Sequence, residues 1–403
     1  MTSQTRARYA IPALASVLYF SQGFPFGIAT DGVNTYLSFL KIDLTTIGLA
    51  ASVGIIWSLK FLWAPLVDVL GTYRLWIGGA VVVLAGATAA LGLVPPAGAA
   101  FWAVLIVLVF ASATQDIAID ALMIRVTPAE LLGVVNSARV AGYRVAMLAA
   151  TGVIGLLAGI IGWSGAFLAA AAVPLILLAM IMIATPKEAG TRERQENPLR
   201  GLLRWITRPG ALPLLAVILL YRLGDNALMA MIRPYWFARG FTPAEVTTVT
   251  STLGMICTIL GAIAGGMFVM RYGIYRALLY LGLVQMLSNL AYAVVAMTNA
   301  GRPGLYGAAI VETFCGGLGT AAFLAFLMFI CDKENAATEY AMLSAVFALG
   351  RTFALALSGY VAKDLGFANY YWLTAALALP GLALLPLVRG RVSNDARAAE
   401  PIP

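Results

Sequence analysis

Residues 185–210 of the chain are TPKEAGTRERQENPLRGLLRWITRPG. This stretch has the charged and polar composition of a soluble loop, and long apolar runs lie on both sides of it. Of all 403 residues, 61% are hydrophobic and only 11% are charged. A soluble domain carries roughly 25% charged residues, whereas a lipid-facing surface needs almost none. We therefore predict an all-α membrane protein that this loop divides into two parts.

The apolar runs are long enough to be membrane-spanning helices, because about 20 apolar residues cross a bilayer. Six precede the central loop, near residues 10–35, 44–66, 75–95, 99–124, 133–160 and 163–184. Six follow it, near residues 211–236, 243–270, 274–297, 303–330, 336–360 and 368–388. We expect three parts: an N-terminal six-helix bundle over 1–184, a linker over 185–210, and a C-terminal bundle with a short tail over 211–403.

Lysine and arginine are divided unevenly between the loops on the two sides of the predicted spans. With the N-terminus inside, sixteen lie in cytoplasmic segments and four in outer loops. Because cytoplasmic loops carry the excess of positive charge, both termini and the linker are expected in the cytoplasm. This topology accounts for the net charge of +8, so we expect no nucleic-acid partner.

A short basic turn occurs at the same place in each half. Gly71-Thr-Tyr-Arg74 follows the second span, and Gly273-Ile-Tyr-Arg276 follows the eighth, 202 residues later. This spacing favours a duplicated six-helix bundle with a pseudo-twofold axis. Twelve spans in two halves around a central cytoplasmic loop resemble the major facilitator architecture, which we favour over another twelve-span fold or a channel.

Eleven ionisable residues remain inside the predicted spans. An ionised group at the bilayer centre costs at least about 2.5–3.5 kcal/mol, so each needs a partner or a wet cavity. Most of them are therefore expected to line a central path. The basic residues are Lys60, Arg139, Arg144, Arg222, Arg233 and Arg351, and the acidic residues are Asp31, Asp116, Asp120, Asp225 and Glu312.

The fourth span carries two carboxylates on one helix face, Asp116 and Asp120, four residues apart. Such a pair disfavours joint ionisation unless a cation intervenes, and Lys60 lies at a comparable depth in the second span. Two interpretations stay open. One is a proton-coupling site, and the other is a gate network at the cytoplasmic mouth to which Asp120 belongs. The gate residues are predicted to be Lys60, Asp68, Arg74, Arg125 and Arg139.

The second half carries acidic residues in its first and fourth spans. Arg222 and Asp225 are three residues apart and can pair with each other, and Gly224 allows a helix or a ligand to approach closely. Glu312 begins the stretch Glu312-Thr-Phe-Cys-Gly-Gly-Leu-Gly319. Its glycines either loosen the helix near the midplane, where transporters build sites, or pack helices tightly.

Two arginines, Arg144 and Arg351, occupy matching positions near the middle of spans five and eleven. Paired central arginines suit an anionic substrate, and the alternative is that they form salt bridges with Asp116 and Glu312. Pro25, with glycines nearby, predicts a kink in the first span. The other residues predicted to bind substrate are Gln22, Asp31, Gln115, Tyr221, Arg222 and Asn226.

The chain contains no histidine, so carboxylates must carry any proton that drives transport. The candidates for proton coupling are Asp116, Asp120, Asp225 and Glu312. Three cysteines lie in apolar runs, and the sequence has no Walker loop, dinucleotide-binding turn or metal-ligand motif. We therefore expect a secondary transporter that acts as a monomer in the bilayer, is not an enzyme and needs no cofactor.

Several segments resemble the AmpG muropeptide permease family, in family order along nearly the whole chain. In the first half they are Thr45-Thr-Ile-Gly48, Lys60-Phe-Leu-Trp-Ala-Pro-Leu-Val-Asp68 and Ala113-Thr-Gln-Asp-Ile-Ala-Ile-Asp-Ala121. In the second half they are Tyr221-Arg-Leu-Gly-Asp225, the stretch from Glu312 to Ala322, and Ala337-Thr-Glu-Tyr-Ala-Met-Leu-Ser344.

The resemblance implies a proton-driven importer of the major facilitator superfamily in the bacterial inner membrane. It implies that the substrate is anhydro-muropeptide from cell-wall turnover, an amphiphilic sugar–peptide with several carboxylates. It also implies coupling and binding roles for Gln115, Asp116 and Asp120. Related families share the segment that begins at Lys60, so import of a siderophore by an RhtX/FptX-like permease, or transport of acetyl-CoA, stays an alternative.

Overall fold

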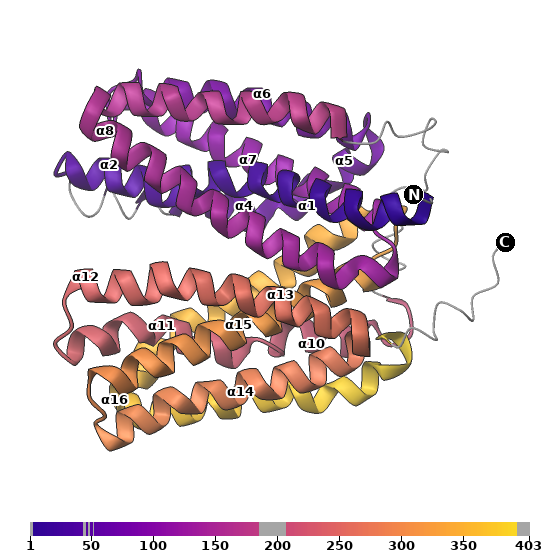
Figure 1. Ribbon diagram of the computed structural model, residues 1–403, viewed down its shortest axis with the longest axis vertical. Coiled ribbons are helices and arrows are strands. Elements are labelled where there is room, and N and C mark those ends of the chain that lie inside the picture. The colour runs from indigo at the N-terminus through magenta and orange to yellow at the C-terminus, as the bar shows by residue number, and fades with distance from the viewer. Residues whose placement is uncertain (1–2, 43–45, 47–48, 51, 185–206, 393–403) are drawn as a thin grey trace. The chain divides into compact units, whose positions relative to one another are not determined.

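The computed structural model describes residues 3–42, 46, 49–50, 52–184 and 207–392, and every regular element in these ranges is a helix (Figure 1). Most of the expected linker (185–206) and the end of the expected tail (393–403) lie outside the described residues. The chain forms two compact units. Unit 1 comprises Met1–Thr127, Ala141–Leu202 and Cys331–Met342. Unit 2 comprises Pro128–Val140, Leu203–Ile330 and Leu343–Pro403.

The first span is helical throughout but irregular in the middle. It consists of α1 (Ser3–Gly27), a π-helical turn η1 (Ile28–Gly32) and α2 (Val33–Phe39). The π-helical turn begins three residues after Pro25. Proline cannot donate the backbone hydrogen bond of a regular helix, and a widened turn is one way to accommodate this loss. The irregularity therefore lies where the sequence predicted a kink.

The second span is the least regular part of the described chain. Residues 43–45, 47–48 and 51 of the expected span 44–66 lie outside the description. The rest forms α4 (Ile55–Leu59), the 3-10 turn η2 (Lys60–Leu62) and α5 (Ala64–Val69). The helix thus changes its winding at Lys60, and it ends three residues later than expected.

The remaining helices of the first half are long. They are α6 (Tyr73–Leu91), α7 (Ala99–Val126) and α8 (Leu132–Ala184), with a 3-10 turn η3 (Ala129–Leu131) before α8. The second half contains α10 (Ala211–Leu220), α11 (Leu223–Ala238), α12 (Pro243–Val246), the π-helical η4 (Thr247–Leu253), α13 (Gly254–Tyr272), α14 (Ile274–Thr298), α15 (Arg302–Ile330) and α16 (Ala336–Val392).

Two of these helices each contain a sharp corner at a glycine (Figure 1). Gly162 in α8 has φ 73° and ψ 170°, and Gly366 in α16 has φ 73° and ψ 159°. Residues with a Cβ avoid this region, so only glycine makes the corner without strain. Each helix therefore accounts for two of the expected spans. The nine described helices that are long and apolar enough to cross a membrane thus cover eleven of the twelve expected spans, and the second is the span described only in part.

The corners also repeat in their packing. Trp163, directly after the first corner, lies on Tyr36 at the end of the first span of its half, with ring centroids 5.0 Å apart. Phe367, directly after the second corner, lies on Tyr235 at the end of the first span of its half, again at 5.0 Å. The same turn and the same aromatic contact occur in both halves, as expected for a duplicated bundle.

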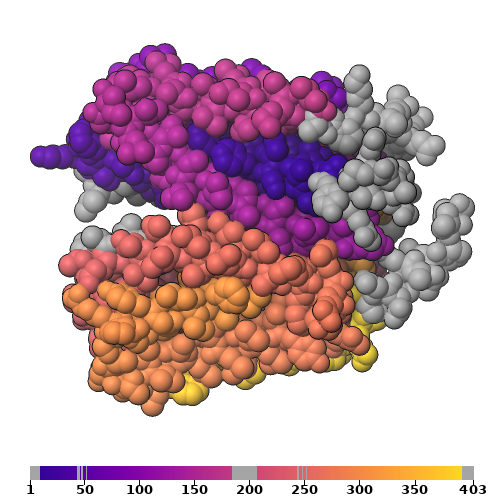
Figure 2. Space-filling view, in the orientation of Figure 1, coloured from indigo at the N-terminus to yellow at the C-terminus, as the bar shows by residue number. Residues whose placement is uncertain are grey.

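Within each unit the helices are packed closely. The space-filling view in Figure 2 shows that atoms fill the spaces left between neighbouring helices in Figure 1. In unit 2, α13 and α15 pack through glycines. A Cβ on Gly261 would overlap the backbone of Phe314, and a Cβ on Gly317 would overlap the backbone of Thr258. Helix α15 is continuous from Arg302 to Ile330. The helix is thus not interrupted at the glycines after Glu312, and one of them, Gly317, packs tightly against α13.

Candidate functional site

Unit 1 contains a buried ion pair between Lys60 and Asp116. Lys60 lies in the 3-10 turn η2 and is 7% exposed, and Asp116 lies on α7. Nearby, Trp63 donates a hydrogen bond to the Thr114 hydroxyl (3.1 Å), and its ring stacks on Phe110 at 4.7 Å. These contacts fix the irregular segment against α7. The cation expected between the two carboxylates of span four is thus Lys60, and it binds Asp116.

Asp120, one turn further along α7, has a different environment. It is 1% exposed and accepts a hydrogen bond from the Tyr19 hydroxyl of α1 at 2.9 Å. Asp116 thus binds an ammonium group, and Asp120 accepts a hydrogen bond from a phenol. This difference separates their chemistry, although both lie on one helix face.

Two buried amides lie between α1 and α7. Gln115 donates to the Ser21 hydroxyl at 2.8 Å, and the neighbouring Gln22 is 6% exposed. The side-chain carbonyl oxygens of Gln115 and Gln22 have no hydrogen-bond partner among the described residues. A buried acceptor without a donor is costly, so these oxygens are available to a polar substrate or to water.

Asp68, at the end of α5, accepts several hydrogen bonds within unit 1. It is fully buried and accepts from the Tyr73 hydroxyl at 2.8 Å. It also accepts from the backbone N–H groups of Ala337 (3.2 Å) and Thr338 (2.7 Å) and from the Thr338 hydroxyl (2.6 Å). Its carboxylate thereby satisfies the open donors in the first turn of α16 and stabilises that helix end.

The other predicted gate residues lie in different surroundings. The Arg125 guanidinium lies over the Tyr73 ring, 5.7 Å from its centroid, and Arg74 donates a hydrogen bond to the carbonyl of Met182. Both residues therefore belong to the region around Asp68. Arg139 lies in the segment Pro128–Val140, which packs with unit 2.

Unit 2 contains a second buried charged cluster. Arg222 lies between α10 and α11 and forms a salt bridge of 3.2 Å with Asp225, so the pairing expected three residues apart is confirmed. Arg222 also donates to the Thr320 hydroxyl of α15 at 2.7 Å. Asn289 of α14 lies 3.5 Å from Asp225. Three helices thus contribute to one polar cluster.

Glu312 of α15 belongs to the same cluster but has no cation in direct contact among the residues described. It is 3% exposed, and its Oε2 atom has no hydrogen-bond partner there. Two glycines on its helix, Gly316 and Gly319, leave room for the Gln285 amide, and Gly319 also leaves room for Arg222. The cluster therefore holds two carboxylates and one guanidinium.

The sequence prediction omitted the residues of α14 in this cluster. Gln285 and Asn289 are one turn apart, and Ser288 and Tyr292 repeat the spacing. All four are buried. Neutral polar side chains at helical spacing in an apolar span predict a polar face, and this signal was available in the sequence.

The remaining predicted binding residues are spread over both units. Tyr221 is buried, bonds the Leu278 carbonyl at 2.7 Å and stacks on Phe323, which are the contacts of a packing residue. A Cβ on Gly224 would overlap the backbone of Thr374, so this glycine allows the close approach of a helix. The exposed residues are Asp31, Arg144 and Arg351, and Asn226 is half-buried.

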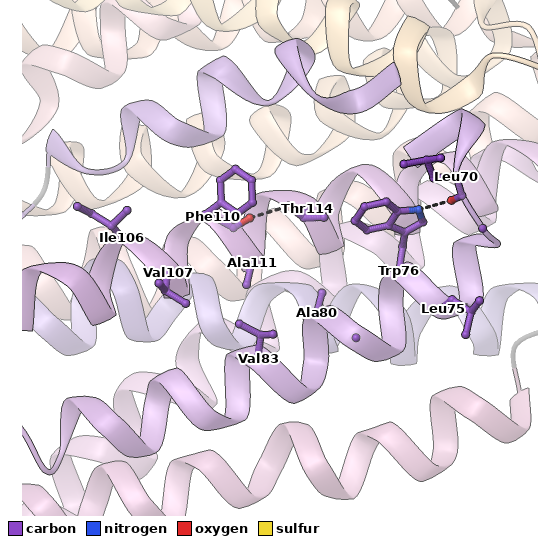
Figure 3. Close-up of a pocket in the computed structure, with 12 residues that line it drawn as sticks. Leu70, Leu75, Trp76, Ala80, Val83, Ile106, Val107, Phe110, Ala111 and Thr114 are labelled. Carbon is purple, nitrogen blue, oxygen red and sulfur yellow. Dashed lines mark hydrogen bonds between the residues drawn. The ribbon is translucent and has the colours of Figure 1, made fainter. Parts of the chain in front are cut away.

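An apolar groove of about 630 Å³ lies between α6 and α7 of unit 1 (Figure 3). Trp76 donates its indole N–H to the Leu70 carbonyl, and Thr114 donates to the Phe110 carbonyl. The polar hydrogens in its lining are thus already used. The groove offers apolar contact without free donors, which suits a hydrocarbon chain and not a charged solute.

Comparison with known proteins places this architecture. The Major Facilitator Superfamily model matches residues 12–338. The chain belongs to this superfamily. It is 34% identical over 389 residues to the anhydromuropeptide permease of Escherichia coli K12. The aligned region covers 94% of this chain and 79% of that protein. It is 26% identical to the transporter AmpG 4 of Rickettsia conorii, with 94% of this chain and 96% of that protein covered.

Solved structures of this superfamily share the fold. The proton:xylose symporter XylE superposes with a TM-score of 0.74 at 12% identity, over 96% of each chain. The fucose:proton symporter FucP of E. coli superposes with a TM-score of 0.72 at 13% identity, over 95% of this chain and 99% of FucP. The chain is thus a multi-pass membrane transporter with relatives among permeases and not among enzymes, and the resemblance found in the sequence is confirmed.

Proposed function

We propose that this protein imports anhydro-muropeptide across the bacterial inner membrane and that a proton gradient drives the import by alternating access. The observation that supports the substrate is the 34% identity to the anhydromuropeptide permease over nearly the whole chain. A muropeptide carries several carboxylates, and the buried cations Lys60 and Arg222 are suited to receive them.

The Lys60–Asp116 pair provides a simple mechanism for coupling. A buried ion pair is stable as long as both charges are present, and it becomes costly when one is lost. A substrate carboxylate that binds the Lys60 ammonium displaces Asp116, which then takes up a proton. The pocket carries the same net charge before and after this exchange, so anion and proton enter together.

Unit 2 provides a second set of groups for the same task. Arg222 balances one of the two carboxylates, Asp225 or Glu312, and the other is stabilised when it binds a proton. Asp120 accepts a hydrogen bond from the Tyr19 hydroxyl. We assign Asp120 a structural role beside the coupling residue Asp116.

The cap that Asp68 forms on α16 is suited to a gate. Three hydrogen bonds to Asp68 hold the first turn of α16 within unit 1, and their loss would free that turn. Arg74 and Arg125 support the same region. We propose that this gate faces the cytoplasm, that both termini lie there, and that the protein works as a monomer.

The test is uptake into proteoliposomes with an imposed pH gradient. Labelled anhydro-muropeptide is expected to accumulate, and a ferric siderophore is the competing substrate to include. Accumulation of the siderophore alone would replace the proposed substrate. Equal uptake with and without the gradient would contradict proton coupling.

A further inference from the structure

A small cavity lies inside unit 2, separate from the Arg222–Asp225 salt bridge. Its volume is about 80 Å³, and α11, η4, α14 and α15 line it. A water molecule needs roughly 10–15 Å³ of such space, so the cavity has room for several. The polar residues in its lining are Arg233, Thr250, Tyr292, Glu312 and Thr313.

The cavity is lined by acceptors that lack donors. Thr250 donates its hydroxyl proton to the Val246 carbonyl at 2.8 Å, and Thr313 donates to the Ala309 carbonyl at 2.7 Å. Each hydroxyl has one proton, so both can only accept a bond from the cavity. Oε2 of Glu312 also has no partner within the described ranges. Three acceptors around one space call for water or a protonated water there.

Tyr292, which lines the cavity, lies beside a second buried polar group, Trp236. The Tyr292 hydroxyl and the Trp236 indole N–H are close to each other, but neither makes a hydrogen bond of regular geometry to a described residue. Both side chains are fully buried. A water in the cavity can bond the phenol, because Tyr292 is one of the lining residues.

The position of the cavity indicates from which side it fills. Glu312 lies ten residues into α15, roughly 15 Å along its axis from Arg302. Arg233 and Tyr292 lie within about two turns of the ends of α11 and α14 that face the same side as Arg302. Arg233 and Met229 are exposed, so the cavity reaches the surface of the unit. That end of the bundle is the outer one in the topology set by the basic loops.

We propose that this cavity is a water-filled access site through which protons from the outer side reach Glu312, with Thr250, Thr313 and Tyr292 holding the water. The inference rests on the proposed proton coupling and adds a proton-binding step in unit 2 that is separate from Lys60–Asp116. The titratable groups within electrostatic reach of Glu312 are Arg222, which directly precedes α11, Asp225 of α11, Tyr292 of α14 and Cys315 of its own helix. Arg233 lies at the rim of the cavity, where its positive charge disfavours a metal cation.

The test removes the water-binding groups and leaves Glu312 in place. Tyr292→Phe and Thr313→Val are prepared in the full chain, and proteoliposomes are assayed for gradient-driven uptake and for exchange of labelled anhydro-muropeptide without a gradient. We expect gradient-driven uptake to fall at least several-fold and to need a more acidic outer pH, while exchange is unchanged. Thr298→Val is the matched control, since Thr298 of α14 makes the same bond to its helix backbone but is exposed.

A second measurement probes the cavity directly, in a chain whose Cys257, Cys315 and Cys331 are replaced by alanine. Thr313→Cys is expected to react with a small water-soluble thiol reagent added outside, whereas Leu305→Cys, buried on the same helix, is not.

The outcomes separate the two proposals. If uptake by the wild-type protein does not depend on the pH gradient, the proposed function is wrong. If wild-type uptake follows the gradient and both variants follow it equally well, this inference alone is overturned. Uptake that requires sodium, and is lost when choline replaces it, would overturn the assignment of the cavity to protons.

Discussion

The two units hold buried charge in different ways. In unit 1, Lys60 and Asp116 form an ion pair, and Asp120, one turn further along α7, accepts a hydrogen bond from Tyr19. In unit 2, Arg222 serves two carboxylates, with amides from α14 and a hydroxyl from α15 around them. A one-to-one pair has no substitute when a member is lost, whereas a cluster can redistribute its charge. The units should therefore respond unequally to matching substitutions.

The largest effect is expected for Asp116→Asn. Gradient-driven uptake should fall to the level of de-energised vesicles, because the group that exchanges its cation for a proton is gone. Exchange of substrate should persist. The substitution should also destabilise the protein by about 3–5 kcal/mol, since it leaves the buried Lys60 ammonium without a counter-charge. Thermal unfolding in detergent measures this loss, and Lys60→Met in the same chain should recover most of it. Normal uptake by Asp116→Asn would remove this residue from the coupling mechanism.

Asp225→Asn should lower the free energy of unfolding by less than Asp116→Asn, on the order of 1–3 kcal/mol. The reason is that Glu312 remains to balance the charge of Arg222. The double variant Asp225→Asn/Glu312→Gln should lose more than the two single variants added together, because no carboxylate is then left for the arginine. The same unfolding assay applies to all three. If the losses of unfolding free energy in the two single variants add up to the loss in the double variant, the two carboxylates do not share Arg222. The contrast between the units would then disappear.

Arg144→Ala and Arg351→Ala should each weaken substrate affinity by about tenfold, equivalent to about 1.4 kcal/mol, with little effect on unfolding. Both side chains are exposed within their units, so their loss creates no buried defect. The substrate concentration that gives half-maximal exchange measures the affinity. Unchanged affinity in both variants would leave the buried cations as the anion-binding groups.

The smallest effect is expected at Glu245, a carboxylate three residues before the described membrane-length helix Thr248–Tyr272. It accepts from the backbone N–H and hydroxyl of Thr242 at 2.9 Å and also contacts Arg302. The backbone N–H of Thr242, then its hydroxyl, lower the pKa of Glu245 below its ordinary value of 4.5. The stabilisation is therefore present at neutral pH and is lost as the pH falls through the lowered pKa.

Glu245→Gln should lower the thermal midpoint slightly at neutral pH and remove this part of its acid dependence. Because the site is solvent-exposed, the change should also shrink at high salt. An identical acid dependence in variant and wild type would show that the contact contributes nothing measurable.

Much of this fold could be predicted from the sequence, because spans are set by length and hydropathy and these are local properties. The Arg222–Asp225 pair follows from helical spacing, and Lys60 was matched to Asp116 by depth alone. The irregular winding at Lys60 was not foreseen, because it depends on how Trp63 packs on Phe110 of α7.

The polar face of α14 was missed for another reason. Gln285 and Asn289 are neutral, so they stand out less than charges in an apolar span, and their importance depends on Asp225 lying opposite. The roles of the glycines after Glu312 depend on the neighbouring helices, because Gly317 packs against α13 whereas Gly316 and Gly319 face Gln285 of α14. Long-range partners determine each of these features, and spacing along one helix does not contain them.

The corners at Gly162 and Gly366 bear on how such a chain can evolve. Around each corner little is retained beyond an apolar residue, the glycine and an aromatic ring: Ile161-Gly-Trp163 in one half and Leu365-Gly-Phe367 in the other. Duplicated segments can thus drift until a search for internal repeats finds almost nothing, while a backbone torsion and one ring contact preserve the ancestral geometry. The two halves thus share a backbone torsion and a ring contact at places where their sequences share little else.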